Sequence, residues 1–267
     1  MWREYFEGKT VVVSGGSTGI GAATVKGFAS AGANVIVADV ADDMGEALTY
    51  SLSEGGAAAT YLHCDVSSED DVANVCRFAE EMYGAIDVVY ANAGIEWTKD
   101  IRHTSLEEWR RVIDVNLTGV FLLARAAMQR MCDAAQGSII VTSSPHAVAT
   151  VPDAGAYAAS KGGVHALVRA LALEGAPFRV RVNGIVPGTI DTPMVRREVQ
   201  AAKDPDHQMV LMAAANPMNR LGRPEEVANV ALFLASPLAE FITGSLFSVD
   251  GGEMAALPSG PPLSYNN

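Results

Sequence analysis

The chain has 267 residues, of which 49% are hydrophobic and 19% are charged, and its 19 basic and 31 acidic residues give a net charge of −12. This composition is that of a globular protein, long enough for one large α/β domain or two small domains. Nucleic acids and anionic membranes attract clusters of Lys and Arg, so the charge argues against both as partners. A small ligand with phosphates remains compatible, because backbone N–H groups can bind it.

The cysteines and the N-terminus indicate where the protein works. Cys64, Cys76 and Cys132 form no Cys-x-x-Cys pair, so we expect buried thiols in a reducing compartment and neither disulfides nor a metal site. The first residues carry acids and lack the apolar stretch of a signal peptide. No apolar run approaches the length of a membrane span, and the expectation is a soluble, cytoplasmic protein.

Short apolar runs alternate with segments of helical spacing along the whole chain. The runs are predicted as buried parallel strands, at 9–14, 35–39, 59–64, 86–91, 137–142, 179–186 and 245–249. Helices are predicted at 22–31, 44–53, 68–83, 106–132 with a break near Asn116, 154–173 and 224–235. Either Thr104 or Ser105 is expected to cap the fourth of these helices.

This alternation, without any composition shift that marks a linker, predicts an α/β fold. We expect a single doubly wound Rossmann domain over residues 1–267, with a seven-stranded parallel sheet and helices on both faces. The polar, Met-rich stretch at about 193–216 is expected to form short helices in a mobile flap over the substrate. A tail from about 253 is expected to be extended.

A glycine-rich turn follows the first predicted strand and opens the first helix. Gly15, Gly19 and Gly21 have the spacing Gly-x-x-x-Gly-x-Gly. Residues without Cβ allow the backbone to approach a phosphate closely, and the helix that follows offers free N–H groups. Asp39 ends the second strand, where a carboxylate suits the ribose hydroxyls of NAD and repels the 2′-phosphate of NADP. The turn therefore predicts a dinucleotide site with NAD as the cofactor.

Tyr157 and Lys161 are four residues apart on a predicted helix, so their side chains share one face. An ammonium group near a tyrosine hydroxyl favours the phenolate and lowers the pKa. The pair can therefore serve as a proton acceptor or donor. Because Tyr-x-x-x-Lys arises often by chance, a helix with a packed Tyr and an exposed Lys is the more common explanation of such a pair on its own.

Several motifs together resemble those of the short-chain dehydrogenase/reductase family of the compact type, and the resemblance covers nearly the whole chain. They are Ser14-Gly-Gly-Ser-Thr-Gly-Ile-Gly21, Cys64-Asp65-Val66, Ala91-Asn-Ala-Gly94, Asp114-Val-Asn116, Tyr157-x-x-x-Lys161, Pro187-Gly-Thr-Ile-Asp-Thr192 and Val249-Asp-Gly-Gly252. Ser14 replaces the family's Thr, and Ala91 replaces an Asn whose local hydrogen bond is then missing.

The resemblance implies a set of site residues. The catalytic group would be Asn116, Ser144, Tyr157 and Lys161, with Ser143 as the alternative to Ser144, which lies thirteen residues before the tyrosine. The cofactor would contact Gly15, Ser17, Thr18, Gly19, Ile20, Gly21, Asp39, Val40, Asp65, Val66, Asn92, Ala93, Gly94, Tyr157, Lys161, Pro187, Gly188, Ile190 and Thr192. The substrate would contact Glu96, Ser144, His146 and Met194, and no metal is expected.

The resemblance also implies a reaction. Hydride transfer between nicotinamide and a carbonyl carbon would be coupled to proton transfer by Tyr157, with Ser144 polarising the oxygen, and the carbonyl of Asn116 would hold a water that links Lys161 to solvent. The polar Glu96 and His146 favour a small hydroxylated substrate such as a sugar, polyol or hydroxy acid. The alternatives are a reductase of an apolar cyclic or steroid-like ketone and a non-catalytic cofactor-binding protein. Family members of this type usually form homotetramers.

Overall fold

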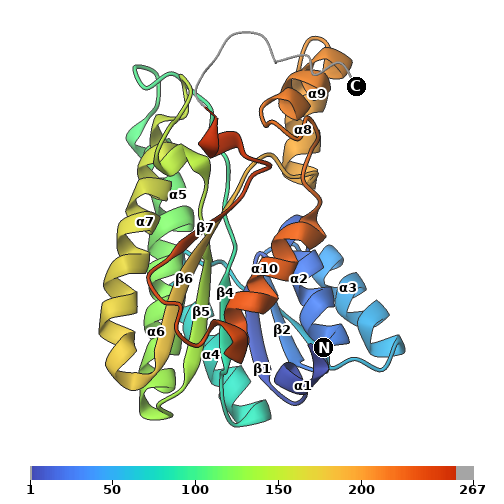
Figure 1. The fold of residues 1–267 in the computed structure, drawn as a ribbon, viewed down its shortest axis with the longest axis vertical. Helices are drawn as coiled ribbons and strands as arrows, with labels where there is room; N and C mark the ends of the chain where they lie inside the picture. Colours follow the sequence, from blue (N-terminus) through green and yellow to red (C-terminus); the bar gives the residue numbers. More distant parts are fainter. Residues whose placement is uncertain (1, 257–267) are drawn as a thin grey trace.

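The computed structural model describes residues 2–256, and at its centre is a sheet of seven parallel strands in the order β3-β2-β1-β4-β5-β6-β7 (Figure 1). The strands are β1 (Thr10–Ser14), β2 (Asn34–Asp39), β3 (Ala59–His63), β4 (Val88–Ala91), β5 (Gly137–Thr142), β6 (Val180–Pro187) and β7 (Leu246–Val249). The predicted α/β fold with its seven-stranded parallel sheet is confirmed. The strand order reverses between β1 and β4, where ligands of such sheets bind.

Helices cover both faces of this sheet (Figure 1). The α-helices are α1 (Arg3–Phe6), α2 (Gly19–Ser30), α3 (Asp42–Glu54), α4 (Glu69–Tyr83), α5 (Leu106–Ile113), α6 (Gly119–Asp133), α7 (Gly155–Gly175), α8 (Pro193–Ala201), α9 (Pro205–Ala214) and α10 (Pro224–Ala235). Short helical segments are η1 (Asp114–Thr118), η2 (Pro145–Ala147), η3 (Ala176–Phe178), η4 (Pro237–Ala239) and η5 (Glu253–Ala255). Residues 257–267 of the expected tail lie outside the described residues.

The strands separate two apolar cores because successive side chains point to opposite faces. On β1, Val12 packs into the core beneath α4, α6 and α7, whereas Val11 and Val13 pack into the core beneath α2 and α10. All three side chains are fully buried. Burial on both faces explains why the strands are continuous apolar runs rather than alternating ones.

The helix that begins at Leu106 corrects one expectation. Residues Leu106–Asp133 form a continuous helical run of 28 residues that is long and apolar enough, by length and composition alone, to cross a membrane. Its Leu122, Leu123 and Met128 are buried in the core. Arg125 forms an ion pair with Glu69 of α4. The apolar surface therefore covers the sheet, as in a core helix.

Two serines begin helices as the sequence indicated. Ser68 caps α4 by accepting a hydrogen bond from the N–H of Asp71. Ser105, rather than Thr104, caps α5, and Glu108 completes a capping box by accepting from the N–H of Ser105. These bonds satisfy N–H groups that have no partner within the helix.

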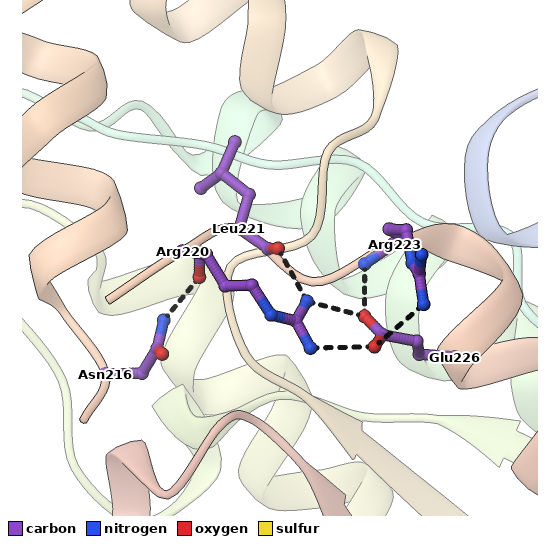
Figure 2. A network of polar contacts seen from close by, with 5 residues as sticks. All are labelled: Asn216, Arg220, Leu221, Arg223 and Glu226. Carbon is purple, nitrogen blue, oxygen red and sulfur yellow. Dashed lines mark hydrogen bonds and ion pairs between the residues drawn. The ribbon is translucent and has the colours of Figure 1, made fainter. Parts of the chain in front are cut away.

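The segment α8–α9 projects beyond the carboxyl ends of the strands and is anchored at both ends (Figure 1). Thr192 caps α8 at its start. At its end, Asn216 donates to the carbonyl of Arg220 at 2.9 Å. Arg220 forms a two-bond ion pair with Glu226 at 2.7 and 2.8 Å, and Glu226 also accepts from the N–H of Arg223 (Figure 2). This network joins the end of the flap to the first turn of α10.

We expect Glu226→Gln to lower the midpoint of thermal unfolding by about 2 °C at pH 7, because it weakens an ion pair and a helix cap. These bonds hold the pKa of Glu226 at about 2. A lowered pKa stabilises the fold above the unfolded value of about 4.3, and this stabilisation is lost as the pH falls towards the folded value.

The difference in midpoint between the wild type and Glu226→Gln should therefore shrink as the pH is lowered from 6 to about 2.5. Calorimetry across this range checks it. The neighbouring Glu225→Gln is the matched control, since Glu225 is an exposed acid on the same helical turn. A constant difference at every pH would contradict the role of the ion pair.

Candidate active site

The glycine turn between β1 and α2 is built by close backbone contacts. Gly15 has a φ of +61°, which favours glycine. A Cβ on Gly21 would lie 2.0 Å from the carbonyl oxygen of Gly15, so only glycine fits there. Thr18 precedes α2 without capping it by its side chain, and the first N–H groups of the helix remain available. The turn has the features of a phosphate site.

Asp39 ties this turn to the end of β2. One carboxylate oxygen accepts from the N–H of Ser17 at 2.9 Å, and the other accepts from the N–H groups of Val40 at 2.8 Å and Ala41 at 3.1 Å. Asp39 also lines the cleft. The carboxylate therefore lines the cleft and also orders the loop, and the sequence did not indicate this second role.

A second acid stands beside Asp39. The hydroxyl of Tyr61 lies 2.7 Å from the backbone oxygen of Asp39 and 2.5 Å from the carboxylate of Asp42, which also contacts His63. The tyrosine ring lies over Gly45, where a Cβ would come within 2.1 Å of it. This cluster places a second carboxylate, paired with His63, at the end of β2.

The end of β4 is held against the glycine turn. The hydroxyl of Ser14 accepts from the N–H groups of Asn92 at 3.1 Å and Ala93 at 3.2 Å. The amide of Asn92 donates to the carbonyl of Gly15 at 3.0 Å. The hydroxyl of Ser14 thus performs a structural role that a side chain without a hydroxyl could not.

One cleft of about 1060 Å³ runs along the carboxyl ends of the strands and joins most of the predicted site residues. It is lined by Gly15, Thr18, Gly19, Ile20, Asp39, Val40, Asp65, Val66, Asn92, Ala93, Gly94, Glu96, Ser144, His146, Tyr157, Lys161, Pro187, Gly188, Ile190, Thr192 and Met194. Ser17, Gly21 and Asn116 do not line it. Ser17 and Gly21 support the lining: Ser17 donates its N–H to Asp39, and Gly21 packs on Gly15.

Asn116 is a positioning residue rather than a lining one. Its side chain is fully buried in η1, a π-helical segment that interrupts the α5–α6 run. The amide oxygen accepts from the N–H of Ile95 at 2.8 Å, and the amide nitrogen donates to the carbonyl of Ile95 and to the hydroxyl of Ser160. Asn116 therefore joins the loop after β4 to α7. The predicted break near this residue takes the form of a π-helical segment within a continuous helix.

Tyr157 and Lys161 share the cleft side of α7, as their spacing predicted. Lys161 is 3% exposed, and its Nζ donates to the carbonyl of Thr142 at 3.0 Å. The same Nζ lies 5.6 Å from the centre of the Tyr157 ring. The ring of His146 packs edge-on against Tyr157 with the centres 5.4 Å apart.

The expectation that Lys161 lowers the pKa of Tyr157 is wrong for this arrangement. Burial raises the pKa of Tyr157 to about 12; the hydroxyl of Ser144 lowers it in part and Glu96 raises it. Burial lowers the pKa of Lys161 to about 8. The ammonium lies over the ring and bonds to Thr142 instead of the phenol oxygen, so it does not offset the burial of the hydroxyl.

Ser144 is the better placed of the two serines. It begins η2, accepts from the N–H of His146 at 3.3 Å, and its hydroxyl reaches Tyr157. Ser143 also borders the cleft, but its hydroxyl is buried without a hydrogen-bond partner among residues 2–256. The contact with Tyr157 favours Ser144 as the residue beside the reacting oxygen.

The segment after β6 completes the far wall. The N–H of Gly188 donates to the carbonyl of Val249 at 3.0 Å, and Ile190 pairs with Gly222 in an isolated bridge. A Cβ on Gly19 would lie 3.1 Å from the Thr192 side chain. The start of the flap at Thr192 therefore contacts the glycine turn at Gly19.

Four acidic residues that line the cleft are absent from the predicted site, namely Glu107, Asp114, Glu198 and Glu253. Glu198 lies on α8, one helical turn after Met194, and Glu253 follows the last strand. An oxygen of Glu253 is buried without a hydrogen-bond partner in the described part of the chain, and burial raises its pKa. The four-residue spacing from Met194 was the signal for Glu198. No group of three acidic, His or Cys side chains suited to a metal occurs among the described residues.

Comparisons with known proteins give the family. A family model described as enoyl-(acyl carrier protein) reductase matches residues 14–253. The chain is 39% identical to cis-4-hydroxycyclohexanecarboxylate dehydrogenase of Sinomonas cyclohexanicum, over 94% of this chain and 99% of that protein. The chain belongs to the short-chain dehydrogenase/reductase family. The resemblance noted in the sequence is confirmed.

Two further relatives fit this assignment. The chain is 40% identical to 3beta-hydroxysteroid dehydrogenase 1 of Eggerthella lenta, over 92% of this chain and 94% of that protein. The solved structure of Thermoplasma acidophilum aldohexose dehydrogenase superimposes with a TM-score of 0.88 at 36% identity, covering 97% of this chain and 99% of that one. The protein is an oxidoreductase of CH–OH groups, and enzymes of this family use a nicotinamide cofactor.

The buried Lys161 gives a testable pH dependence of stability. Its pKa is lowered to about 8 in the folded protein, from an ordinary value of 10.5. The unfolded chain therefore binds more protons between these values, and folding stability rises with pH across this window. Below pH 8 the full cost of burying the charge is present.

We expect the free energy of unfolding of the wild type, minus that of Lys161→Met, to rise by roughly 2–3 kcal/mol between pH 7 and pH 10.5. Urea unfolding at several pH values measures this difference. Lys203→Met, which replaces an exposed lysine, is the control and should show no such rise. Parallel curves for the wild type and Lys161→Met would contradict the burial of a charged group.

Proposed function

We propose that the protein is an NAD-dependent dehydrogenase that interconverts a secondary alcohol and a ketone by hydride transfer, with a small hydroxylated substrate. The observation that carries this proposal is the single cleft that runs from the glycine turn and Asp39 to Ser144, Tyr157 and Lys161. One end has the features of a dinucleotide site, and the other end holds proton-transfer groups.

The residues present fit a nicotinamide dinucleotide. The open N-terminus of α2 and the turn at Gly15 would hold the phosphates, and Asp39 would hold the adenosine ribose. The walls at Asn92–Gly94 and at Pro187–Thr192 would border the nicotinamide. When bound, this cofactor accepts or donates the hydride.

The preference for NAD rests on charge. Asp39 lines the cleft and Asp42 shares a contact with Tyr61 directly beside it. The glycine turn contains no Lys or Arg, and none directly follows Asp39. Without a Lys or Arg at these positions, the Asp39 carboxylate disfavours a 2′-phosphate. The charge of Asp42 is offset in part by its contact with His63.

Tyr157 is the proposed general acid and base. With its pKa raised to about 12 the hydroxyl is protonated at neutral pH, which suits proton donation during ketone reduction. In alcohol oxidation the phenolate must form, and mildly alkaline pH favours this direction. Ser144 would donate a hydrogen bond to the substrate oxygen, where charge develops.

Lys161 and Asn116 would support this step from behind. A lysine with its pKa near 8 can exchange a proton at working pH, and it lies over the Tyr157 ring. By the family resemblance it would also bind the nicotinamide ribose. Asn116 fixes Ile95 and Ser160 and so holds the two walls that carry Glu96 and Lys161.

The substrate end combines polar and apolar groups. Glu96 and His146 line it, and burial lowers the pKa of His146, whose Nδ1 contacts the hydroxyl of Thr150 at 2.8 Å. A neutral imidazole and a carboxylate can both bind hydroxyl groups. These groups support a sugar, polyol or hydroxy acid.

A second candidate is the reduction of an apolar cyclic or steroid-like ketone. Trp97, Val151, Met194 and Met212 also line this end of the cleft and offer apolar contacts. The named activity of the Eggerthella relative is of this kind. A panel of sugars, polyols, hydroxy acids and cyclic alcohols, followed by NADH absorbance at mildly alkaline pH, separates the two candidates.

The assembly and location are further proposals. Leu173, Phe178, Leu238 and Phe241 are exposed apolar side chains that self-association would cover, which supports a homotetramer. The free cysteines Cys64, Cys76 and Cys132 support a reducing, cytoplasmic location. The charge of −12 argues against nucleic-acid and anionic-membrane partners. Light scattering of the purified protein tests the assembly.

We expect Tyr157→Phe to lower kcat by at least about 100-fold, because the substitution removes the proton donor and acceptor. The dissociation constant for NAD should change less than about twofold, since the ring and its contacts are kept. Stopped-flow turnover and fluorescence titration measure the two quantities. Tyr50→Phe is the control on an exposed tyrosine. A variant that keeps more than a tenth of the wild-type kcat would refute the assignment.

Asp39→Ala should reduce the ratio of kcat/KM for NAD over NADP by about tenfold or more, because it removes the charge that opposes the 2′-phosphate. Since Asp39 also orders the Ser17 loop, the variant should bind both cofactors more weakly. Asp43→Ala removes an exposed acid from the first turn of α3, the next helix along the chain, and serves as the control. An unchanged ratio would argue against the ribose role.

A further inference from the structure

Two acidic side chains enter the substrate end of the cleft from separate walls. Glu96 lies on the loop after β4, and Glu198 lies on α8 of the flap. Both line the cleft that contains Ser144 and Tyr157. Asn116 fixes the first wall through Ile95, next to Glu96. The two carboxylates therefore border one ligand space from two sides.

The carboxylates influence each other and the reacting centre. Glu198 raises the pKa of Glu96, in addition to the loss of water around that carboxyl group. Glu96 in turn raises the pKa of Tyr157. The negative field at this end of the cleft thus extends from the flap to the hydroxyl that handles the proton.

Neither carboxylate has a cationic partner within 4 Å in the described part of the chain, although basic residues are close in sequence. Lys99 is paired with Glu108 at 2.7 Å, and Arg196 is paired with Asp191 at 2.7 Å. Four basic residues also line the cleft, namely Arg110, Arg111, Lys161 and Arg197. Of these, Arg197 directly precedes Glu198 on α8 and is the basic side chain that competes with the field of Glu198.

We propose that Glu96 and Glu198 determine the charge preference of the substrate pocket, so that the enzyme accepts alcohols whose second polar group is a hydroxyl or an ammonium and disfavours alcohols that carry a carboxylate. This inference rests on the proposed dehydrogenase function and narrows its substrate class. Ionised carboxylates accept hydrogen bonds and offer none, so they bind donors and repel anions. Hydroxy acids are thereby separated from sugars and polyols.

A ring series tests the inference with shape held nearly constant. The probes are 4-(hydroxymethyl)cyclohexanol, 4-aminocyclohexanol and 4-hydroxycyclohexanecarboxylate, each in cis and trans forms. Each probe is assayed with NAD as a substrate and as an inhibitor of the best substrate from the alcohol panel. The carboxylate should show kcat/KM, or inhibitory affinity, on the order of tenfold below that of the hydroxymethyl compound, as expected for like charges several ångströms apart in a partly solvated site.

Charge-neutral variants assign the effect to the two residues. Glu96→Gln and Glu198→Gln should each reduce the discrimination against the carboxylate by about threefold, and the double variant by about tenfold. Glu174→Gln, on the exposed end of α7, removes the same charge far from the cleft and should leave the ratio unchanged. Arg197→Gln should leave the carboxylate disfavoured.

The inference is overturned if the carboxylate is used or bound as well as the hydroxymethyl compound. It is also overturned if the hydroxymethyl and amino probes neither react nor inhibit. The third contrary result is that Arg197→Gln loses carboxylate binding while the Glu variants keep the wild-type ratio of hydroxymethyl compound to carboxylate. Each can occur while the panel still gives NADH, and the dehydrogenase function then stands. Lack of turnover with every alcohol and either cofactor would instead remove the proposed function, and with it this inference.

Discussion

A close backbone contact between the glycine turn and the end of β4 determines where the rest of the site lies. A Cβ on Gly15 would come within 2.7 Å of the Cα of Ala93, and Asn92 donates to the carbonyl of Gly15 at 3.0 Å. Only glycine at position 15 allows the loops after β1 and β4 to meet in one cleft. The loop that leaves this contact continues to Ile95 and Glu96, so the cofactor end and the substrate end share one connected wall.

Asn116 extends this wall to the catalytic helix. By binding Ile95 with both ends of its amide and reaching Ser160, it fixes the loop after β4 relative to the residue before Lys161. The π-helical turn places this fully buried amide between the two. The same burial lowers the pKa of Lys161 and raises that of Tyr157. Proton transfer at Tyr157 therefore depends on burial and on neighbouring groups such as Ser144 and Glu96, and not on the Tyr157–Lys161 pair alone.

The sequence predicted the fold well because most strands are continuous apolar runs and several helices, such as α4 and α5, have clear start signals. It also placed Tyr157 and Lys161 on one helix face, since that follows from spacing alone. The direction of the Lys161 ammonium was not predictable, because its partner is the carbonyl of Thr142, nineteen residues earlier on another element. The bond from the N–H of Ser17 to Asp39 and the closeness of Glu198 to Glu96 likewise depend on tertiary contacts that no local pattern contains.

The charge of the pocket and the chemistry of Tyr157 are linked through Glu96. A negative Glu96 opposes formation of the phenolate, and Glu198 increases the negative field around it. Hydrogen-bond donors on a bound substrate offset part of that field, because they partly compensate the carboxylate charge. A substrate rich in hydroxyl groups would then ease ionisation of Tyr157 on binding, whereas a carboxylate would oppose it. Substrate preference and acid–base strength at this site are therefore two consequences of the same arrangement of charges.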